Sequence, residues 1–546
     1  MKKLNTYYEI YLYFYNIAKR KIFLGTVLFI FSGIIETITA ALIGLSLSTI
    51  SNNSLNSIFI YKYLSLFFLD PLIGLFIVTT VLISISFFIN LFVLKYIRDV
   101  ISEISTNSIS GILESQFNLP FKELLSKTVG ESVSLITNQA NAVFNVLINN
   151  TLMILKSLFV LIFLVISIFL TSFTSGFVII FTGLLLFRFV YFRNVVVSKK
   201  LGKEITLNNI KLNTKIQNLF KFSERIKANN FESKFFNISK TYIRNIYFRQ
   251  NEVFYLSQFP RVTIEFVFFN LLILTLILIN LPTVSNTDLF TELTIIGVFL
   301  IKILTSFQQV YANSTTFTSN IEAWNIISQI YPKEVEIEPQ KTFFGEFKVL
   351  SLINIVHSFD GKLILNNFSY NFKNKGLYLI TGDSGSGKTT LLRIISGLIV
   401  PESGIIKIDE KIHNANAKFQ DLAYLPANTE LFDLSIFDHF NLDTNNIPVE
   451  IMNKMLQDLN INLESINSNK KQEKEFSTGE IQRILISGEL LRSKNIYIFD
   501  EPTSNLNLEN IETVIFKLKE LSQKKLVIIS SHNSSIKNLA DEIIEL

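Results

Sequence analysis

Long runs of apolar residues dominate roughly the first three hundred positions of the chain. A helix needs about 20 mostly apolar residues to cross a bilayer. Six stretches reach or approach that length, and they cover approximately residues 22–50, 71–94, 152–171, 176–192, 262–281 and 289–312. The pattern therefore predicts that residues 1–330 form an all-α transmembrane domain with six membrane-spanning helices.

The spacing of these stretches is uneven. The second and third are far apart, as are the fourth and fifth, and both long connections keep a helical pattern with few glycines or prolines. We expect the spans to continue beyond the membrane as helices joined by turns near Gly130–Ile136 and Asn229–Asn237. The first segment, "MKKLNTYYEIYLYFYNIAKRK", lacks the pattern of a signal peptide. Its basic and aromatic residues predict a helix lying on the membrane surface.

Charge predicts the orientation of the spans. Residues 194–259 contain twelve Lys or Arg against four Glu and no Asp, whereas the three short connections hold one basic residue, Lys62. Basic residues favour the cytoplasmic side of a membrane. We therefore expect a multi-pass protein of the cell inner membrane, with both termini and the C-terminal region in the cytoplasm.

The composition changes near residue 331. The stretch 331–345, "YPKEVEIEPQKTFFG", reads as a linker, and short apolar runs then alternate with helical patterns through residues 346–546. This alternation predicts an α/β domain. The chain has 0 Cys, which excludes disulfides and thiolate metal sites, and its net charge of +5 over 546 residues gives no reason to expect a nucleic-acid partner.

A phosphate-binding motif opens the α/β region. The stretch "GDSGSGKT", Gly382–Thr389, follows an apolar run and matches GxxxxGK[ST] in full. In such a P-loop the backbone wraps around phosphates, the lysine reaches the β- and γ-phosphates and the hydroxyl binds Mg²⁺. We assign these roles to Lys388 and Thr389. The residues expected to contact nucleotide here are Gly382, Asp383, Ser384, Gly385, Ser386, Gly387, Lys388, Thr389 and Thr390.

Three further stretches carry candidate chemistry. In "NIYIFDEPTSNLN" an apolar strand ends at Asp500, a candidate Mg²⁺ ligand, and Glu501 is a candidate base for the attacking water. In "FSTGEIQR" the pair Ser477 and Glu480 fits a helix capping box. The apolar run in "VIISSHN" leads to His532, one of 4 histidines in the chain.

Together these motifs resemble the nucleotide-binding domain of an ABC transporter. In that family the phosphate loop, the signature sequence, the Asp-Glu strand, the D-loop and a switch histidine occur in this order. The resemblance implies Asp500 and Thr389 as Mg²⁺ ligands and Glu501 and His532 as catalytic residues. It also implies adenine stacking by Phe359. The signature residues implied by the resemblance are Ser477, Thr478, Gly479 and Glu480.

The layout of the whole chain resembles a half-transporter of the exporter type. The resemblance implies ATP and Mg²⁺ as cofactors, a lipid bilayer around the helices, and a second half-transporter chain, favouring a homodimer over a heterodimer. The turns near 131–136 and 230–237 would then be coupling helices. The general pattern of the membrane half is also similar to flippases for lipid-linked oligosaccharides.

The sequence departs from the family at several positions. Ala427 stands where a glutamine is usual, Thr478 where a signature glycine is usual, and Asn507 where the D-loop has aspartate. Separately, the predicted spans contain four ionisable residues, Glu36, Lys156, Glu265 and Lys302. Such residues suggest a functional site. For Lys302 we weigh contact with an anionic head group of the cargo against an interhelical ion pair.

The expected function is ATP-driven outward movement of an amphiphile, with a lipid-linked oligosaccharide as one candidate cargo. A peptide or drug exporter and a weakly active subunit of a heterodimeric exporter remain alternatives. A membrane-anchored ATP sensor without transport is a third.

Overall fold

A computed structural model gives the fold of the chain. It describes residues 2–51, 70–171, 173–279, 286–330, 346–359, 361–413, 421–427, 429–432, 434–442, 447–462 and 476–546, so the predicted linker 331–345 lies outside the described residues. The chain divides into two compact units. One comprises Met1–Phe117 with Ser126–Lys333, and the other comprises Asn118–Leu125 with Glu334–Leu546.

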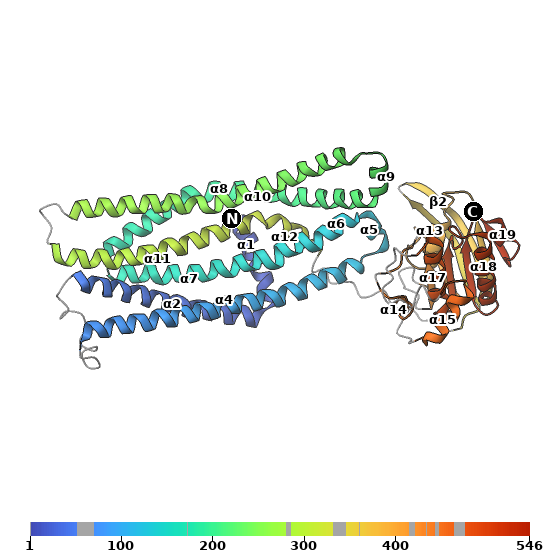
Figure 1. The fold of residues 1–546 in the computed structure, drawn as a ribbon, viewed down its shortest axis with the longest axis horizontal. Coiled ribbons are helices and arrows are strands. Elements are labelled where there is room, and N and C mark those ends of the chain that lie inside the picture. The colour runs from blue at the N-terminus through green and yellow to red at the C-terminus, as the bar shows by residue number, and fades with distance from the viewer. Residues whose placement is uncertain are drawn as a thin grey trace. The chain divides into compact units, whose positions relative to one another are not determined.

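The first unit is built of helices (Figure 1). Its long members are α2 (Lys19–Ser51), α4 (Pro71–Phe117), α7 (Ile148–Thr171), α8 (Phe173–Lys221), α10 (Glu232–Ile279) and α11 (Asn286–Ser319). Its short members are α1 (Lys2–Ile17), α6 (Val129–Ser134), the π-helical segments η2 (Leu135–Ala140) and η3 (Ala142–Leu147), α9 (Ser223–Ala228) and α12 (Ile321–Ile327). Each of the six apolar stretches thus lies within a helix, apart from residues outside the described ranges.

The long helices extend well beyond their apolar stretches. Helices α4, α8 and α10 have 47, 49 and 48 residues, so the connections between spans are helical, as their periodicity predicts. Among the described residues, three helical stretches are long and apolar enough to cross a membrane: Lys19–Thr49, Leu72–Phe117 and Val129–Leu170.

Helix α1 packs one face against neighbouring helices. Ile10 and Phe14 are buried in a core that also contains Phe144 and Trp324, and the membrane-surface location of the segment stays a prediction. The ring centroids of Tyr13 and Trp324 are 4.8 Å apart in an edge-on arrangement. Tyr13 and Phe14 therefore pack against protein, whereas Tyr8 on the same helix is 62% exposed.

The first turn between long helices also differs from the expectation near Gly130–Ile136. Helix α4 ends at Phe117, three residues before Pro120, and a short helix, α5 (Phe121–Ser126), follows. Proline lacks an amide hydrogen and disfavours helical conformation in the residue before it, so it breaks the helix here. Gly130 instead lies in α6 against α8, where an added Cβ would be 2.6 Å from Thr214 Cα.

Helix α5 belongs largely to the C-terminal unit. Residues Asn118–Leu125 group with that unit, and Phe121 packs beside its core. The guanidinium carbon of Arg393 lies 5.5 Å from the centroid of the Phe121 ring, a cation–π contact. The helix that the sequence places near residues 131–136, resting on the nucleotide-binding region, is therefore found at Phe121–Ser126. The second turn, at Asn229–Phe231 between α9 and α10, overlaps the predicted stretch.

The C-terminal unit contains two sheets (Figure 1). An antiparallel sheet has the order β2-β1-β4-β5, from β1 (Val349–Phe359), β2 (Lys362–Lys373), β4 (Ser403–Ile408) and β5 (Lys411–His413). A parallel sheet has the order β6-β7-β8-β3-β9, from β3 (Gly376–Thr381), β6 (Leu422–Leu425), β7 (Ile496–Asp500), β8 (Leu526–Ser530) and β9 (Glu542–Glu545). The helices are α13 (Lys388–Ile395), α14 (Ile436–Phe440), α15 (Val449–Asp458), α17 (Thr478–Leu491), α18 (Leu508–Ser522) and α19 (Ser534–Lys537).

The parallel sheet is covered on both faces. Side chains of β7 alternate between two cores: Tyr497 and Phe499 pack in the core formed with α15, α17 and α18, and Ile496 and Ile498 in the core formed with α13 and the antiparallel sheet. Strands covered on both faces read as continuous apolar runs. In such α/β sheets, ligands bind at the carboxyl ends of the strands.

Candidate nucleotide site

The phosphate loop connects β3 to α13 at the carboxyl end of the parallel sheet. Gly387 is the N-cap of α13 and has a φ of 105°, in the left-handed region that favours glycine. An added Cβ at Gly387 would lie 2.7 Å from Cγ2 of Ile364. The motif therefore needs glycine here for both conformation and space, and the first helical residue is Lys388.

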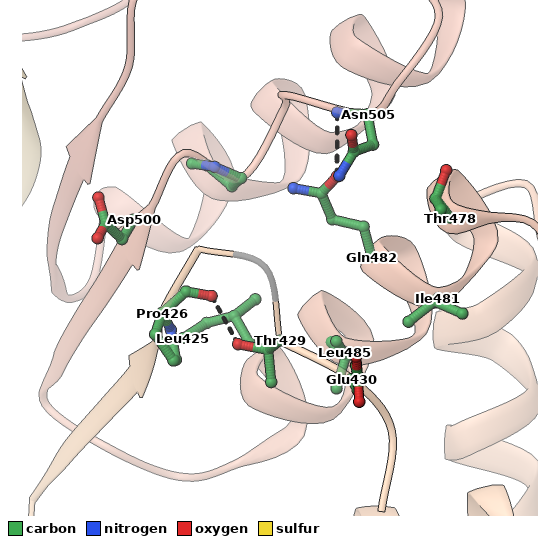
Figure 2. A pocket seen from close by; sticks show the side chains of 11 residues that line it. Leu425, Pro426, Thr429, Glu430, Thr478, Ile481, Gln482, Leu485, Asp500 and Asn505 are labelled. Atoms are coloured by element: carbon green, nitrogen blue, oxygen red, sulfur yellow. Dashed lines mark hydrogen bonds between the residues drawn. The ribbon is translucent and has the colours of Figure 1, made fainter. Parts of the chain in front are cut away.

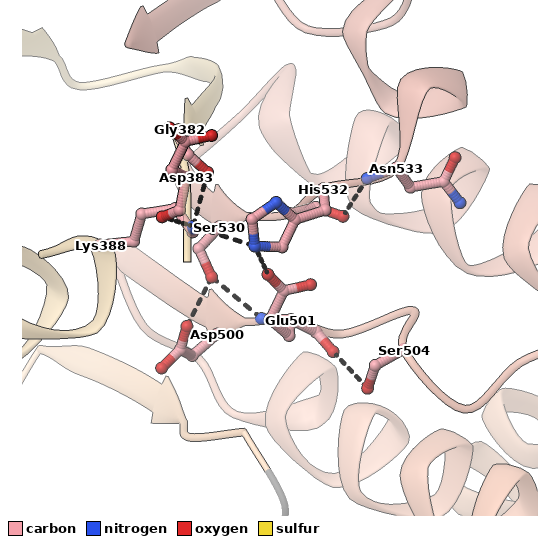
Figure 3. A network of polar contacts seen from close by, with 10 residues as sticks. Gly382, Asp383, Lys388, Asp500, Glu501, Ser504, Ser530, His532 and Asn533 are labelled. Atoms are coloured by element: carbon pink, nitrogen blue, oxygen red, sulfur yellow. Dashed lines mark hydrogen bonds and ion pairs between the residues drawn. The ribbon is translucent and has the colours of Figure 1, made fainter. Parts of the chain in front are cut away.

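The side chain of Lys388 holds the loop closed. It is 8% exposed, and its Nζ donates to the carbonyl oxygens of Gly382 at 2.8 Å and Asp383 at 3.0 Å. The same Nζ lies 3.0 Å from Nε2 of His532 (Figure 3). These contacts place the ammonium group of Lys388 at the loop, where phosphates are expected.

Ser530 joins the two acidic residues at the end of β7. Its Oγ donates to Oδ1 of Asp500 at 2.5 Å and accepts from the backbone N–H of Glu501 at 3.0 Å. Asp500 is 4% exposed, and its Oδ2 has no hydrogen-bond partner among the residues that the structure describes. One carboxylate oxygen is thus fixed while the other is left open to a ligand.

Glu501 adopts a conformation that turns the chain sharply after the strand. Its φ is 52°, unusual for a residue other than glycine and a source of local strain. Its Oε1 lies 3.6 Å from Nε2 of His532. Burial raises the pKa of the Glu501 carboxyl, and the nearby His532 and Lys388 oppose this shift by favouring the charged form. A carboxylate with a raised pKa is a better proton acceptor, as a general base requires.

The candidate signature residues open helix α17. Ser477 is the N-cap, and it forms with Glu480 the capping box that the sequence predicts. Thr478 is exposed at the rim of a pocket of about 220 Å³ that Asp500 also lines (Figure 2). An added Cβ at Gly479 would lie 2.9 Å from the carbonyl oxygen of Asn505, so only glycine allows this close approach.

Gln482 connects this helix to the acidic strand. Its Nε2 donates to the carbonyl oxygen of Glu501 at 3.0 Å. Its Oε1 accepts from the backbone N–H of Asn505 at 3.3 Å, as Figure 2 shows. The side chain therefore holds both ends of the turn that follows the candidate base.

The remaining candidates are dispersed. Phe359 is 50% exposed at the end of β1, where it pairs with Lys362. Asp383, Ser384 and Gly385 lie at the tip of the phosphate loop, and all three are exposed. Asn507 is the N-cap of α18, accepting from the backbone N–H of Asn510 at 3.0 Å, so asparagine keeps the capping function that aspartate would also serve.

The chemistry of the site fits Mg·ATP. The open Oδ2 of Asp500 is a hard oxygen ligand of the kind Mg²⁺ prefers, and Thr389 is placed at the start of α13 where its hydroxyl can join it. Ser386 Oγ in the loop is buried and also lacks a partner within the described part of the chain. Orphaned polar atoms in the loop and at the strand end are what a phosphate and its metal ion would satisfy.

Sequence reasoning missed Ser530 and Gln482. Both lie inside stretches singled out for other residues, "VIISSHN" and "FSTGEIQR". The role of Ser530 depends on which strand lies next to β7, and β8 is that neighbour. The role of Gln482 depends on where helix α17 packs beside the turn that follows β7. For Ser530, the sequence signal is a serine at the end of a buried apolar run, because a buried polar side chain needs a hydrogen-bond partner.

Comparison with known proteins matches residues 365–504 to the family described as ABC transporter. Over 205 residues the chain is 29% identical to the sn-glycerol-3-phosphate import ATP-binding protein of Psychromonas ingrahamii, covering 36% of this chain and 55% of that protein. It is 31% identical over 201 residues to a probable ABC transporter ATP-binding/permease protein of Haemophilus influenzae, covering 35% and 36%. The chain thus spans about half the length, or less, of these relatives.

A solved structure extends the likeness to both units. The structure of a bacterial Atm1-family ABC exporter with ATP bound matches with a TM-score of 0.73 and 14% identity, covering 97% of this chain and 94% of that one. The fold and site define a P-loop nucleotide-binding domain joined to a bundle of long apolar helices. Residues 365–504 match the ABC transporter family, and the chain as a whole has the fold of an ABC exporter in which a helical half and a nucleotide-binding domain are fused.

Proposed function

We propose that the chain is an ATP-hydrolysing half-transporter that moves an amphiphile outward across the cell inner membrane. The observation that supports ATP hydrolysis most directly is the network that joins Lys388, Glu501 and His532 beside Asp500. It brings a phosphate-binding cation, a candidate metal ligand and a base with a raised pKa to one edge of the sheet. These are the parts that phosphoryl transfer to water requires.

Each residue has a proposed role. Glu501 accepts the proton of the attacking water, and His532 orients the Glu501 carboxylate across the 3.6 Å between them. Thr389 and Asp500 hold Mg²⁺, which when bound neutralises charge on the phosphates. Lys388 contributes the fixed positive charge of the loop, and Phe359 offers a ring for adenine stacking.

The active unit is proposed to contain two chains. Each contributes one phosphate loop and one signature, and the signature residues Ser477–Glu480 would face the loop of the other chain. Closure of the two nucleotide-binding domains would then drive alternating access of the helices. We place the nucleotide-binding domain and both termini in the cytoplasm, on the charge distribution of the loops.

The cargo class is proposed as an amphiphile. A lipid-linked oligosaccharide remains a candidate because the pattern of the helical half is similar to that of flippases for such lipids. The names of the two relatives given above do not mention such a substrate. Peptide and drug export are the alternatives.

The test is ATP hydrolysis by the purified chain in nanodiscs, with Glu501→Gln. Loss of a general base should lower the turnover by about 10²- to 10⁴-fold while nucleotide binding persists. The matched control is Glu512→Gln, on α18 at a distance in sequence from the network. Undiminished hydrolysis by Glu501→Gln would contradict the role of Glu501 as the base. Wild-type protein that binds ATP without hydrolysis, both alone and with a second half-transporter chain, would contradict the transport function and favour an ATP sensor.

A second candidate is a weakly active subunit of a heterodimer. Ala427 leaves the turn after β6 without an amide side chain, and Thr478 puts a side chain where close approach to a phosphate is expected. Hydrolysis that appears only after a different half-transporter chain is added would support this candidate. Full activity of the isolated homodimer would exclude it.

A further inference from the structure

Three ionisable residues of the helical unit lie on three different helices that pack against one another. They are Glu36 on α2, Lys156 on α7 and Lys302 on α11. The fourth ionisable residue of the predicted spans, Glu265, is accounted for locally, because it pairs with Arg261 at 2.8 Å on the same helix.

Lys156 is anchored by a polar contact. Its Nζ donates to Oδ1 of Asn90 on α4 at 2.6 Å, and the same oxygen accepts from Oγ of Ser32 at 3.2 Å. Four helices therefore contribute to one polar cluster, which we define as Ser32, Glu36, Asn90, Lys156 and Lys302.

The charges in this cluster do not balance. The three residues lie one helical turn from Ala40, Val160 and Phe299, which pack in one buried group, so the charges of Glu36 and Lys302 act on Lys156 with opposite sign. Two lysines and one glutamate leave a net charge of +1, from 2 − 1. Within the part of the chain that the structure describes, Lys302 has no ion pair, and no ion pair within 4 Å joins any two of these three residues.

An apolar core borders the cluster. Ala40, Val160 and Phe299 belong to one buried group, and they lie one helical turn from Glu36, Lys156 and Lys302, respectively. Water is scarce beside such a core, so an uncompensated positive charge there is costly. A lysine in this position, with no ion-pair partner among the described residues, is a candidate for a partner supplied by a ligand.

We propose that Lys302, with Lys156, binds the anionic head group of the transported amphiphile. The inference rests on the proposed function and narrows its substrate class to acidic amphiphiles. Asn90 holds Lys156 in place, and the apolar residues of the neighbouring turns receive the first part of the chain or ring system attached to the head group. Glu36 offsets the charge of one of the two lysines, so the cluster keeps one net positive charge for the head group.

The experiment measures binding by calorimetry, independently of ATP. The full chain in phosphatidylcholine nanodiscs is titrated with dioctanoyl phosphatidylglycerol, dioctanoyl phosphatidylcholine or glycerol phosphate. The first carries an anionic head group and tails, the second balances its phosphate with a cation, and the third has no tails. We expect binding of the first that exceeds binding of the other two by at least about tenfold, the value of one charge-assisted hydrogen bond.

Variants test the residues. Lys302→Gln should weaken binding of dioctanoyl phosphatidylglycerol by about tenfold or more, and Lys302→Arg should preserve it. The matched control is Lys95→Gln, since Lys95 is an exposed lysine of α4 outside the cluster. If Lys302→Gln does not fold, Lys156→Gln and Lys302→Arg still test whether lipid binding needs the positive charges. Weaker binding by Lys156→Gln together with preserved binding by Lys302→Arg would support that requirement.

Equal affinity for the two lipids, or unchanged binding by Lys302→Gln, would overturn the inference. Tight binding of glycerol phosphate alone would show an anion site without a requirement for an amphiphile, and would overturn it too. The two proposals can fail separately: hydrolysis sensitive to Glu501→Gln without selective lipid binding removes the cargo inference, and selective binding without hydrolysis removes the transport function.

Discussion

The nucleotide site and the charged cluster of the helical unit both place charge beside an apolar core, but they hold that charge differently. At the nucleotide site Lys388 is bonded to two carbonyl oxygens and Asp500 to Ser530. In the helical unit Lys302 has no ion pair among the described residues, and each helix supplies one or two members. A preorganised network suits chemistry, because the groups need not move during the reaction. An unbalanced cluster suits a binding site that its ligand completes.

The largest effect is expected from Lys388→Ala. This substitution removes the buried cation that the loop carbonyls hold, and hydrogen bonds to charged groups are the stronger kind. ATP affinity, measured by binding of a radiolabelled nucleotide, should fall by about a hundredfold. Binding of dioctanoyl phosphatidylglycerol should be unchanged, which would separate the two regions.

Lys411→Ala is the matched control, because Lys411 is an exposed lysine on β5 of the same unit. An unchanged ATP affinity in Lys388→Ala would show that the buried lysine of the loop does not contribute to nucleotide binding. Loss of lipid binding in the same variant would show that the regions are not independent.

A smaller effect is expected from Gln482→Ala. The variant loses the hydrogen bonds to Glu501 and Asn505, so the turn that carries the candidate base is less well positioned. Steady-state ATP hydrolysis should fall by up to about thirtyfold, from two neutral hydrogen bonds of about 1 kcal/mol each, with ATP affinity retained. Gln457→Ala on α15 is the control; a drop in affinity without a drop in turnover would assign Gln482 a different role.

These two variants also show how far the sequence could be read. The position of Lys388 follows from eight consecutive residues, since the loop and the start of α13 are a local structure. Ser530 reaches Asp500 because β8 lies next to β7, and Gln482 reaches the turn after β7 because α17 packs beside it. Both contacts depend on the fold and not on the neighbouring sequence. The same limit applies to the first predicted turn: Pro120 is the local signal, and the helical pattern on either side of it outweighs the proline when the sequence is read alone.

The membrane half illustrates the opposite case. Its six apolar stretches predicted the helices well because length and apolar content are properties of each segment alone. The pairing of Lys156 with Asn90, on another helix, has no local signature. The packing of Tyr13 of helix α1 against Trp324 also has no local signature, because aromatic residues suit an interface and a protein core equally well.

The pH dependence of hydrolysis sharpens the assignment of the base. A base must be deprotonated, and burial raises the pKa of Glu501, so activity should fall on acidification at a higher pH than for an ordinary glutamate. Because His532 lowers that pKa, His532→Ala should move the acid limb of kcat/KM to still higher pH. A limb that stays in place would separate His532 from Glu501, and a pH-independent rate would exclude Glu501 as the base.

The smallest effect is expected from Ala427→Gln. Ala427 follows β6, and its neighbours Leu425, Pro426 and Thr429 line the pocket that Asp500 also lines. A glutamine there offers an amide toward the open side of the metal site, where Oδ2 of Asp500 has no partner among the described residues. One added neutral hydrogen bond is worth about 1 kcal/mol, so the turnover of ATP in nanodiscs should rise about fivefold. Ala427→Met matches the length without the amide and should leave the rate unchanged. The rest of the network is present with alanine at this position. A higher turnover would therefore show that the missing amide after β6 limits hydrolysis. An equal or lower turnover would show that the turn after β6 has no part in hydrolysis here.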